Sequence, residues 1–351
     1  MLTTLLSFAF VLGVLIFVHE LGHFVTAKMV GIKVETFSLG FPPRAFGFKY
    51  GDTDYCISWL PLGGYVKMAG MIDESLDDQV TGAPWEYASK PVWQRVLVIS
   101  AGSMMNFITA ILILGGIAYS SGIGDMAAGA LVSETLPETP ASAVGILPED
   151  VIISIDEQRV ETAQDLIQIV NRNAGNQLAI RWERQGQILE SKITPELDTD
   201  RDVGLIGIKV GTKVLYRDAG LLECIQYGAI NSYKLIVLTA GALKMIITGE
   251  ESFRDSVGGP IIIAKLAGES ARRGFEALLS FTAFISLNLA FFNMLPFPVL
   301  DGGHLVMLLI EGVMRKPIPV KAKLMVQKIG MAFLLALMIF ILFNDISRWN
   351  Q

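Results

Sequence analysis

The first eighteen residues of this 351-residue chain, Met1 to Val18, carry no charge and lead directly into His19-Glu20-Leu21-Gly22-His23. An apolar run of this kind is typical of a membrane helix, where ionisable groups are costly and usually functional. On a helix His19 and His23 share one face, as two ligands of one metal ion must, and Glu20 lies close enough to hold a water molecule. The alternative is a pair of helix-end histidines that face lipid headgroups.

The composition indicates a membrane protein. Hydrophobic residues make up 52% of the chain, charged residues only 18%, and the mean hydropathy is +0.50. A net charge of −6 without any basic run argues against nucleic acid as a partner. Cys56 and Cys224 form neither a disulfide framework nor a CxxC metal site. The N-terminal run lacks a basic region and a cleavage site, so we interpret it as a retained helix.

Four stretches are apolar enough to span a bilayer. The predicted spans cover about 2–28, 94–120, 277–300 and 327–346, the last extended by Lys328 and Asp345 reaching to the interface. Residues 224–248 are also apolar but include Lys234 and Lys244, so we assign 201–274 to amphipathic helices at the membrane surface.

Basic residues cluster in two of the connecting segments. They are Lys28, Lys33, Arg44, Lys49, Lys67, Lys90 and Arg95 after the first span, and Arg315, Lys316, Lys321, Lys323 and Lys328 before the last. The positive-inside rule puts both segments in the cytoplasm and the termini and residues 125–275 outside. His19, His23 and Asp301 then share a similar depth toward the cytoplasmic side. A span at 224–248 would put Asp301 on the opposite face.

A catalytic zinc normally takes three protein ligands and keeps one position open, so one more ligand is needed. The segment from Asn293 to His304 reads N-M-L-P-F-P-V-L-D-G-G-H, and its two prolines break the helix and expose backbone groups. Asp301 follows the break and is the best candidate for the third ligand of one zinc ion. The alternatives are that Asp301 only caps a helix, or that His304 ligates in its place.

These motifs resemble the site-2 protease family of intramembrane zinc metalloproteases, most closely its bacterial regulator-of-sigma-E branch. The resemblance rests on HELGH, on N-M-L-P-F-P-V-L-D-G, on P-L-G-G-Y-V-K-M at residues 61–68 and on G-G-P at 258–260. It implies zinc bound by His19, His23 and Asp301, a catalytic base at Glu20, and substrate contacts from Asn288 and Asn293. The family pattern assigns the third ligand to Asp301 and leaves His304 with a supporting contact.

One departure from the family pattern occurs in the second span. The family commonly shows A-G-P-x-x-N, whereas this chain has Ala101-Gly102-Ser103-Met104-Met105-Asn106. We expect the missing proline to alter a local kink without touching a proposed ligand. Asn106 either contributes to the active site or makes an ordinary hydrogen bond between helices.

Two further regions have a recognisable character. Residues 126–200, with P-A-S-A-V-G-I-L-P-E-D-V-I-I-S-I-D-E-Q-R-V at 140–160, resemble a single PDZ domain in its permuted bacterial form. Such a domain binds peptides at a sheet edge and would filter substrates by their external parts; the alternative is a purely architectural cap. Residues 34–68 resemble the family's membrane-associated β-hairpin, which would hold an unwound substrate; a simple cytoplasmic loop is the competing interpretation.

The expected fold is a polytopic α-helical membrane protein with four transmembrane helices, a membrane-associated β-hairpin and one inserted α/β PDZ domain. Its core comprises residues 1–124 and 275–351. The expected protein is a monomeric zinc endopeptidase of the bacterial inner membrane, with its termini and PDZ domain periplasmic, acting in regulated intramembrane proteolysis. It would cleave single-span membrane proteins, such as anti-sigma factors or signal-peptide remnants. A non-catalytic PDZ scaffold and a zinc hydrolase of lipids or small amides are the alternatives.

Overall fold

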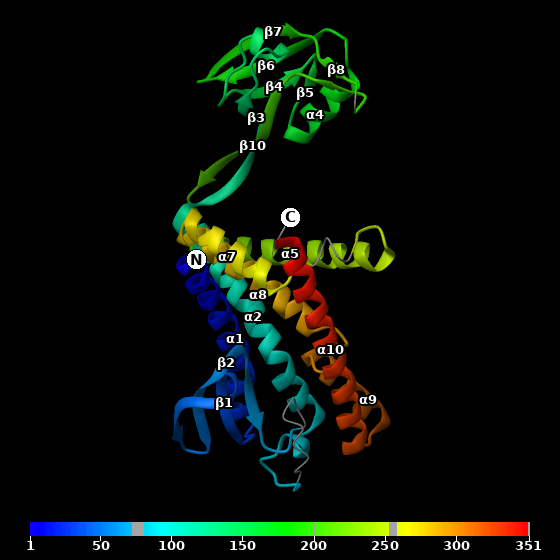
Figure 1. Cartoon of the computed structure of the whole chain (residues 1–351). Coiled ribbons are helices and arrows are strands. Elements are labelled where there is room, and N and C mark those ends of the chain that lie inside the picture. The colour runs from blue at the N-terminus through cyan, green and yellow to red at the C-terminus, as the bar shows by residue number, and fades with distance from the viewer. Residues whose placement is uncertain (72–80, 200, 253–257, 350–351) are drawn as a thin grey trace. The chain divides into compact units, whose positions relative to one another are not determined.

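The computed structural model describes residues 1–71, 81–199, 201–252 and 258–349. The chain divides into two compact units, one formed by residues 1–120 and 220–351 and the other by residues 121–219. The first unit is mainly helical and the second is built on a β-sheet (Figure 1).

Within the described residues, the helical unit has five helices that are long and apolar enough to cross a membrane. They are α1 (Leu2–Met29), α2 (Val92–Ser121), α5 (Leu221–Thr248), α8 (Phe275–Asn293) and α10 (Val320–Trp349). The shorter helices are η1 (Tyr87–Ser89), α7 (Pro260–Arg273) and α9 (Asp301–Met314).

Helix α5 differs from the other four long helices in its direction. It runs crosswise to α1, α2 and α10, at the end of the bundle where α1 begins and α10 ends (Figure 1). Thr239 on α5 donates a hydrogen bond to Asn288 Oδ1 on α8 at 3.3 Å. The beginning of α1 and the end of α10 lie at the same end of the bundle (Figure 1).

The observed helix α8 is shorter than the third apolar stretch of the sequence. Helix α8 ends at Asn293, seven residues before the predicted end of the span at 300. Pro296 and Pro298 lack the backbone N–H that would continue the helix, and residues 294–300 form an irregular turn. The chain then enters α9, an additional helix that the hydropathy pattern did not reveal.

The strands β1 (Val34–Tyr50) and β2 (Thr53–Met68) form an antiparallel sheet on the helical unit. Both strands fold back on themselves, because residues 36–39 pair with residues 64–67 on one side and with residues 54–57 on the other. Residues 64–68 therefore form an outer segment of this sheet. The sheet has more paired segments than the simple hairpin expected from the sequence.

The second unit contains a sheet of strand order β10-β3-β4-β6-β7, with β5 beside β4. Its elements are β3 (Ile123–Thr135), α3 (Pro140–Ala143), β4 (Val151–Ile155), β5 (Gln158–Arg159), α4 (Ala163–Arg172), β6 (Leu178–Arg184), β7 (Gln187–Ile193), β8 (Glu196–Asp198), β9 (Val203–Leu205) and β10 (Ile208–Arg217). One apolar core, including Ile152, Leu166 and Trp182, fills the space between the sheet and α4.

The prediction of amphipathic helices throughout 201–274 is wrong for its first part. Residues 203–205 and 208–217 are strands β9 and β10, and they belong to the unit formed by residues 121–219. Strand β10 pairs antiparallel with β3, from Ile208 opposite Thr135 to Arg217 opposite Ile123. This pairing joins segments that are distant in sequence, so local patterns do not reveal it, and it widens the unit beyond the predicted 126–200.

The G-G-P sequence at residues 258–260 begins helix α7 and meets a buried carboxylate. Asp345 of α10, which we expected to extend the last span toward the interface, is only 1% exposed and contacts the start of α7. Its Oδ1 accepts the backbone N–H of Gly259 at 2.9 Å and its Oδ2 that of Ile261 at 3.0 Å. The carboxylate therefore caps the positive end of α7 and ties this helix to α10.

Replacing Asp345 with alanine is expected to destabilise the helical unit by about 2 kcal/mol, because the N–H groups at the start of α7 lose a charged acceptor in a buried place. Asp345→Asn keeps one acceptor oxygen and should lose less. Thermal unfolding of the purified protein in detergent measures both. Equal midpoints for the wild type and both variants would contradict this role of Asp345.

Candidate metal centre

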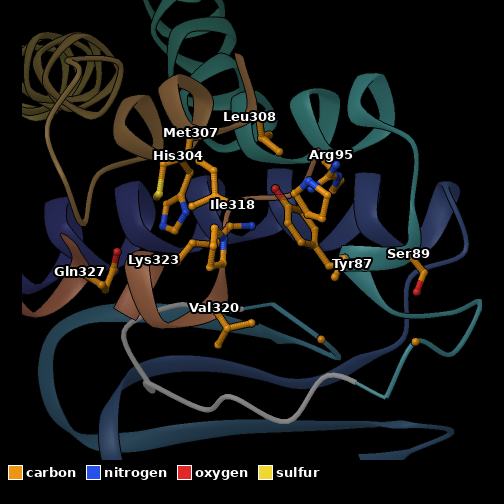
Figure 2. A pocket seen from close by; sticks show the side chains of 15 residues that line it. Tyr87, Ser89, Arg95, His304, Met307, Leu308, Ile318, Val320, Lys323 and Gln327 are labelled. Carbon is orange, nitrogen blue, oxygen red and sulfur yellow. The ribbon is translucent and has the colours of Figure 1, made fainter. Parts of the chain in front are cut away.

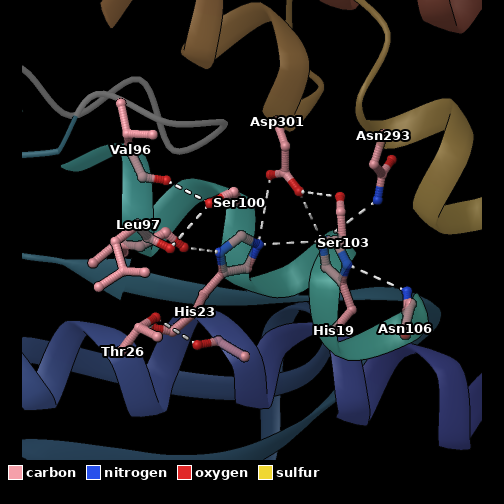
Figure 3. Close-up of polar contacts among 12 residues, drawn as sticks. His19, His23, Thr26, Val96, Leu97, Ser100, Ser103, Asn106, Asn293 and Asp301 are labelled. Atoms are coloured by element: carbon pink, nitrogen blue, oxygen red, sulfur yellow. Dashed lines mark hydrogen bonds and ion pairs between the residues drawn. The ribbon is translucent and has the colours of Figure 1, made fainter. Parts of the chain in front are cut away.

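Helix α1 and the start of α9 bring three ligand-type side chains together. His19 and His23 lie one turn apart on α1, and Asp301 is the first residue of α9 (Figure 3). The Nε2 atoms of the two histidines are 3.2 Å apart. Asp301 Oδ2 lies 3.5 Å from His19 Nε2, and Asp301 Oδ1 lies 3.5 Å from His23 Nε2. The residues singled out as ligands from the sequence are thus adjacent.

The hydrogen bonds of His23 orient it as a ligand. Its Nδ1 lies 2.8 Å from the carbonyl oxygen of Val98, which can only accept, so Nδ1 carries the proton. Nε2 of the neutral ring then presents its lone pair to His19 and Asp301. A histidine that donates its second ring N–H to a backbone carbonyl is the usual arrangement in metal sites.

The spacing of these atoms fits a zinc ion. Atoms about 2.0–2.1 Å from one tetrahedral ion lie about 3.3 Å from one another, and the ligand-atom separations here are 3.2 and 3.5 Å. Lone pairs of two nitrogens and a carboxylate would repel one another without a cation between them. His19 and His23 are 9% and 7% exposed, so solvent screens this repulsion poorly. The donor set, two imidazoles and one carboxylate, is typical of catalytic zinc.

Helix α2 contacts all three of these side chains. Besides the Val98 carbonyl, Ser103 Oγ donates to Asp301 Oδ2 at 3.0 Å. Asn106 Nδ2 lies 3.3 Å from His19 Nδ1. The expectation that the change at position 103 touches no proposed ligand is therefore wrong. The bond that Asn106 makes between helices is thus a contact with a proposed ligand.

The side-chain amide of Asn106 is better described in the opposite orientation. As drawn, its Oδ1 is buried without a partner while Nδ2 faces His19 Nδ1. Exchanging the two amide atoms lets Oδ1 accept the proton of His19 Nδ1, which leaves the lone pair of Nε2 free for a metal. Asn106 then holds His19 as the Val98 carbonyl holds His23.

Gly102 allows α2 to approach the two imidazoles. A Cβ atom at this position would overlap His23 Nε2 and also lie within contact of His19 Cε1. Any larger residue would push α2 away from α1 or displace the rings. Close helix contact through a small residue is common in membrane proteins, where apolar side chains alone provide little attraction between helices.

The turn between α8 and α9 sets the position of Asp301. Val299 has a φ of 81°, a backbone conformation that β-branched residues rarely adopt. Leu300 is the N-cap of α9, so the Asp301 side chain emerges in the first turn of this helix. Such unfavourable dihedral angles cluster at functional sites, where the surrounding structure maintains them.

The two asparagines proposed to contact substrate have different surroundings. Asn293, the last residue of α8, has its Nδ2 3.4 Å from His19 Nε2 and so borders the metal centre. Asn288 donates to the carbonyl oxygen of Phe284 and accepts from Thr239 on α5. Its described hydrogen bonds therefore point away from the cluster of His19, His23 and Asp301.

Glu20 lies against the β1–β2 sheet. A Cβ atom built on Gly64 would lie 3.0 Å from Glu20 Cγ, 2.7 Å from Ile16 Cγ2 and 2.8 Å from the carbonyl oxygen of Ser38. Gly64 thus lets the outer segment of the sheet pass directly over the helix turn that carries Glu20. This close approach explains why the P-L-G-G-Y-V-K-M motif has a glycine at position 64.

His304 lies beside a pocket of about 410 Å³ (Figure 2). The pocket is also lined by Tyr87, Arg95, Lys323 and Gln327. In the described part of the chain, the group of residues able to hold a metal consists of His19, His23 and Asp301, without His304. This favours Asp301 over His304 as the third ligand.

A buried carboxylate next to this pocket joins three helices. Glu311 of α9 accepts from Arg95 Nη1 of α2 and from Lys323 Nζ of α10, both at 2.7 Å, and from the backbone N–H of Ile318 at 3.0 Å. Arg95 is therefore a structural ion-pair partner and not a freely solvated loop charge.

With this geometry established, comparison with known proteins identifies the family. Residues 7–337 match Peptidase family M50, which is the site-2 protease family. The chain belongs to this family. The resemblance predicted from its motifs is thereby confirmed, and the protein is a zinc metalloprotease with several membrane helices.

Relatives of this M50 peptidase cover nearly the whole chain. A Clostridium perfringens protein named "Putative zinc metalloprotease" is 37% identical over 332 residues, which are 95% of each chain. The regulator of sigma-W protease RasP of Bacillus subtilis is 29% identical over 420 residues, covering 98% of each chain. A crystal structure of the PDZ domain of an SdrC-like protein from Listeria monocytogenes covers 25% of this chain and 93% of its own, with 18% identity and a TM-score of 0.23.

Proposed function

We propose that this M50 peptidase is an intramembrane endopeptidase that hydrolyses a peptide bond within or beside the transmembrane segment of single-span membrane proteins. The observation that carries the proposal is the convergence of His19, His23 and Asp301 at mutual distances suited to one zinc ion. Two of these residues lie on α1, a helix apolar enough to cross a membrane.

The residues of the chain have separate tasks in this reaction. When bound, zinc polarises the scissile carbonyl and lowers the pKa of a water molecule. Glu20 takes a proton from the attacking water and later delivers it to the leaving amine nitrogen. Asn293 Nδ2 lies 3.4 Å from His19 Nε2 and is near enough to donate to a substrate backbone carbonyl. Asn288 would contact substrate farther along α8.

The β1–β2 sheet would hold the substrate in an extended form. A transmembrane helix has its backbone hydrogen bonds satisfied internally, so it must unwind before a peptide bond can reach the metal. Residues 64–68 pair with residues 34–39, and Gly64 lies over the helix turn that carries Glu20. An extended substrate segment could add to this sheet beside Glu20.

The proposed topology has α1, α2, α8 and α10 as the four spans and α5 and α7 at the membrane surface. The crosswise direction of α5, and the common end at which α1 begins and α10 ends, support this arrangement (Figure 1). By the positive-inside rule, the proposed orientation has the HELGH and LDG motifs toward the cytoplasm and the unit of residues 121–219 on the periplasmic side of a bacterial inner membrane. We propose that this unit acts as a PDZ filter for substrate ectodomains.

A panel of single-span substrates, each with and without its ectodomain, tests the proposal. Incubation with the purified protein in lipid vesicles should produce fragments whose ends, mapped by mass spectrometry, lie in or next to the transmembrane segment. A zinc chelator should abolish these fragments and added zinc should restore them. Substrate binding without cleavage under all conditions would instead favour the non-catalytic scaffold. Faster cleavage of ectodomain-free substrates would support the filter.

A further inference from the structure

Ser103 makes a contact that the family pattern does not predict. Its Oγ donates to Asp301 Oδ2 at 3.0 Å, across 198 residues of sequence (Figure 3). Ser103 is 3% exposed and the Asp301 side chain is 13% exposed. A hydrogen bond from a hydroxyl to a carboxylate is charge-assisted, and the surrounding protein shelters this one from water.

The direction of the Ser103 hydroxyl is informative because a serine in a helix has a local alternative. Serine hydroxyls in helices often donate to the carbonyl of the preceding turn. Ser100, three residues earlier on α2, does this: its Oγ donates to the carbonyl oxygen of Val96 at 2.8 Å. Ser103 on the same helix instead donates to a carboxylate from α9.

This bond acts on the orientation of the Asp301 carboxylate. Asp301 Oδ2 is the oxygen that faces both Ser103 and His19, whereas Oδ1 faces His23. An aspartate carboxylate otherwise rotates over a broad range about its last side-chain bond. With Oδ2 bound to Ser103, both oxygens keep their direction toward the two imidazoles.

We propose that Ser103 is a positioning residue, which orients Asp301 for metal binding and raises the zinc affinity of this protein. The inference rests on the proposed role of Asp301 as the third ligand. It gives each ligand one partner on α2: Val98 for His23, Asn106 for His19 and Ser103 for Asp301. This support for the aspartate requires a hydroxyl at position 103, which chains with the A-G-P-x-x-N pattern lack.

Zinc affinity measured by competition with a coloured chelator tests this role. Ser103→Ala removes the hydroxyl without adding bulk, and the zinc dissociation constant should rise about 10- to 100-fold. Ser103→Thr keeps a hydroxyl and should restore most of the affinity. Ser100→Ala, on the same helix and with a purely local hydrogen bond, should bind zinc like the wild type. Cobalt-substituted protein should show altered visible absorption bands only in Ser103→Ala, because these bands report ligand geometry.

Thermal unfolding of the zinc-free proteins separates positioning from folding. Without metal, Ser103→Ala should unfold at a slightly lower temperature than the wild type, because it lacks one buried hydrogen bond, and the difference should widen once zinc is added. If Ser103→Ala binds zinc as tightly as the wild type and gives the same cobalt spectrum, the inference is overturned, although wild-type zinc binding and cleavage would still stand. If Ser103→Thr fails to recover affinity while its zinc-free form is stable, the hydroxyl is not the cause and the inference is also overturned.

Discussion

Replacing Glu20 with glutamine is expected to leave zinc bound and to lower the rate of peptide cleavage by about 10²- to 10⁴-fold. Glutamine has nearly the shape of glutamate but cannot accept the proton of the attacking water. Glu20 is not among His19, His23 and Asp301, the residues whose atoms converge, so metal binding should persist. Metal content by elemental analysis and cleavage rate on one substrate give the two readings.

Glu35→Gln provides a matched control for this substitution. Glu35 lies on β1, where its carboxylate is 3.5 Å from Lys67 Nζ, and it takes no part in the metal centre. We expect Glu35→Gln to keep both zinc and activity. Full cleavage activity in Glu20→Gln would remove Glu20 from the proposed mechanism and require another proton acceptor.

Asp301→Ala should lose most of its bound zinc, with affinity falling by more than about 100-fold, because changes in groups that merely support a ligand already cost 10- to 100-fold. Two neutral imidazoles without the carboxylate form an incomplete donor set for catalytic zinc. His304→Ala is the matched comparison, since His304 lies one turn away on α9 and lines the adjacent pocket. It should retain zinc like the wild type.

The reverse outcome for this pair would reassign the third ligand. If Asp301→Ala kept its zinc and His304→Ala lost it, the carboxylate would be only the cap of α9. The 3.5 Å distances from Asp301 to both imidazole nitrogens make the first result the expected one. Chelator competition on the two purified variants under identical conditions distinguishes them.

Much of the candidate site could be predicted from local sequence. The spacing of His19 and His23 requires a shared helix face, and the absence of other charges in that span made them conspicuous. Asp301 could be proposed because zinc needs a third ligand and the two prolines before it interrupt a helix. The contact of Asn293 with His19 agrees with the neighbourhood that the family resemblance implies for this asparagine.

The supporting contacts on α2 could not be predicted in the same way. Ser103 and Asn106 are polar residues in an apolar helix, which was the available signal, but polar groups there usually bond to neighbouring helices or to their own backbone. Their actual partners, Asp301 and His19, depend on which face of α2 turns toward α1 and α9. For this reason the sequence does not reveal that position 103, where the family has proline, contacts a proposed ligand.

The fold also has features that local sequence predicts and features that it does not. Hydropathy identified α1, α2, α8 and α10, because the length of an apolar run is a property of one segment. It did not identify α9, whose 14 residues are too few to stand out, or the addition of β10 to the sheet of β3. Strand pairing between residues 123 and 217 requires the chain to close a long loop, and no short window records that partnership.

The amino-acid sequence by itself determined that this protein has membrane helices carrying an HExxH metal motif, since charge-free length and four-residue spacing act within a single helix. Only the tertiary structure decided that α2 supplies a partner for each proposed ligand and that the β1–β2 sheet passes over Glu20 at Gly64. The physical reason is that these contacts join side chains far apart along the chain. Their distances follow from how the helices and strands pack, which no local pattern specifies.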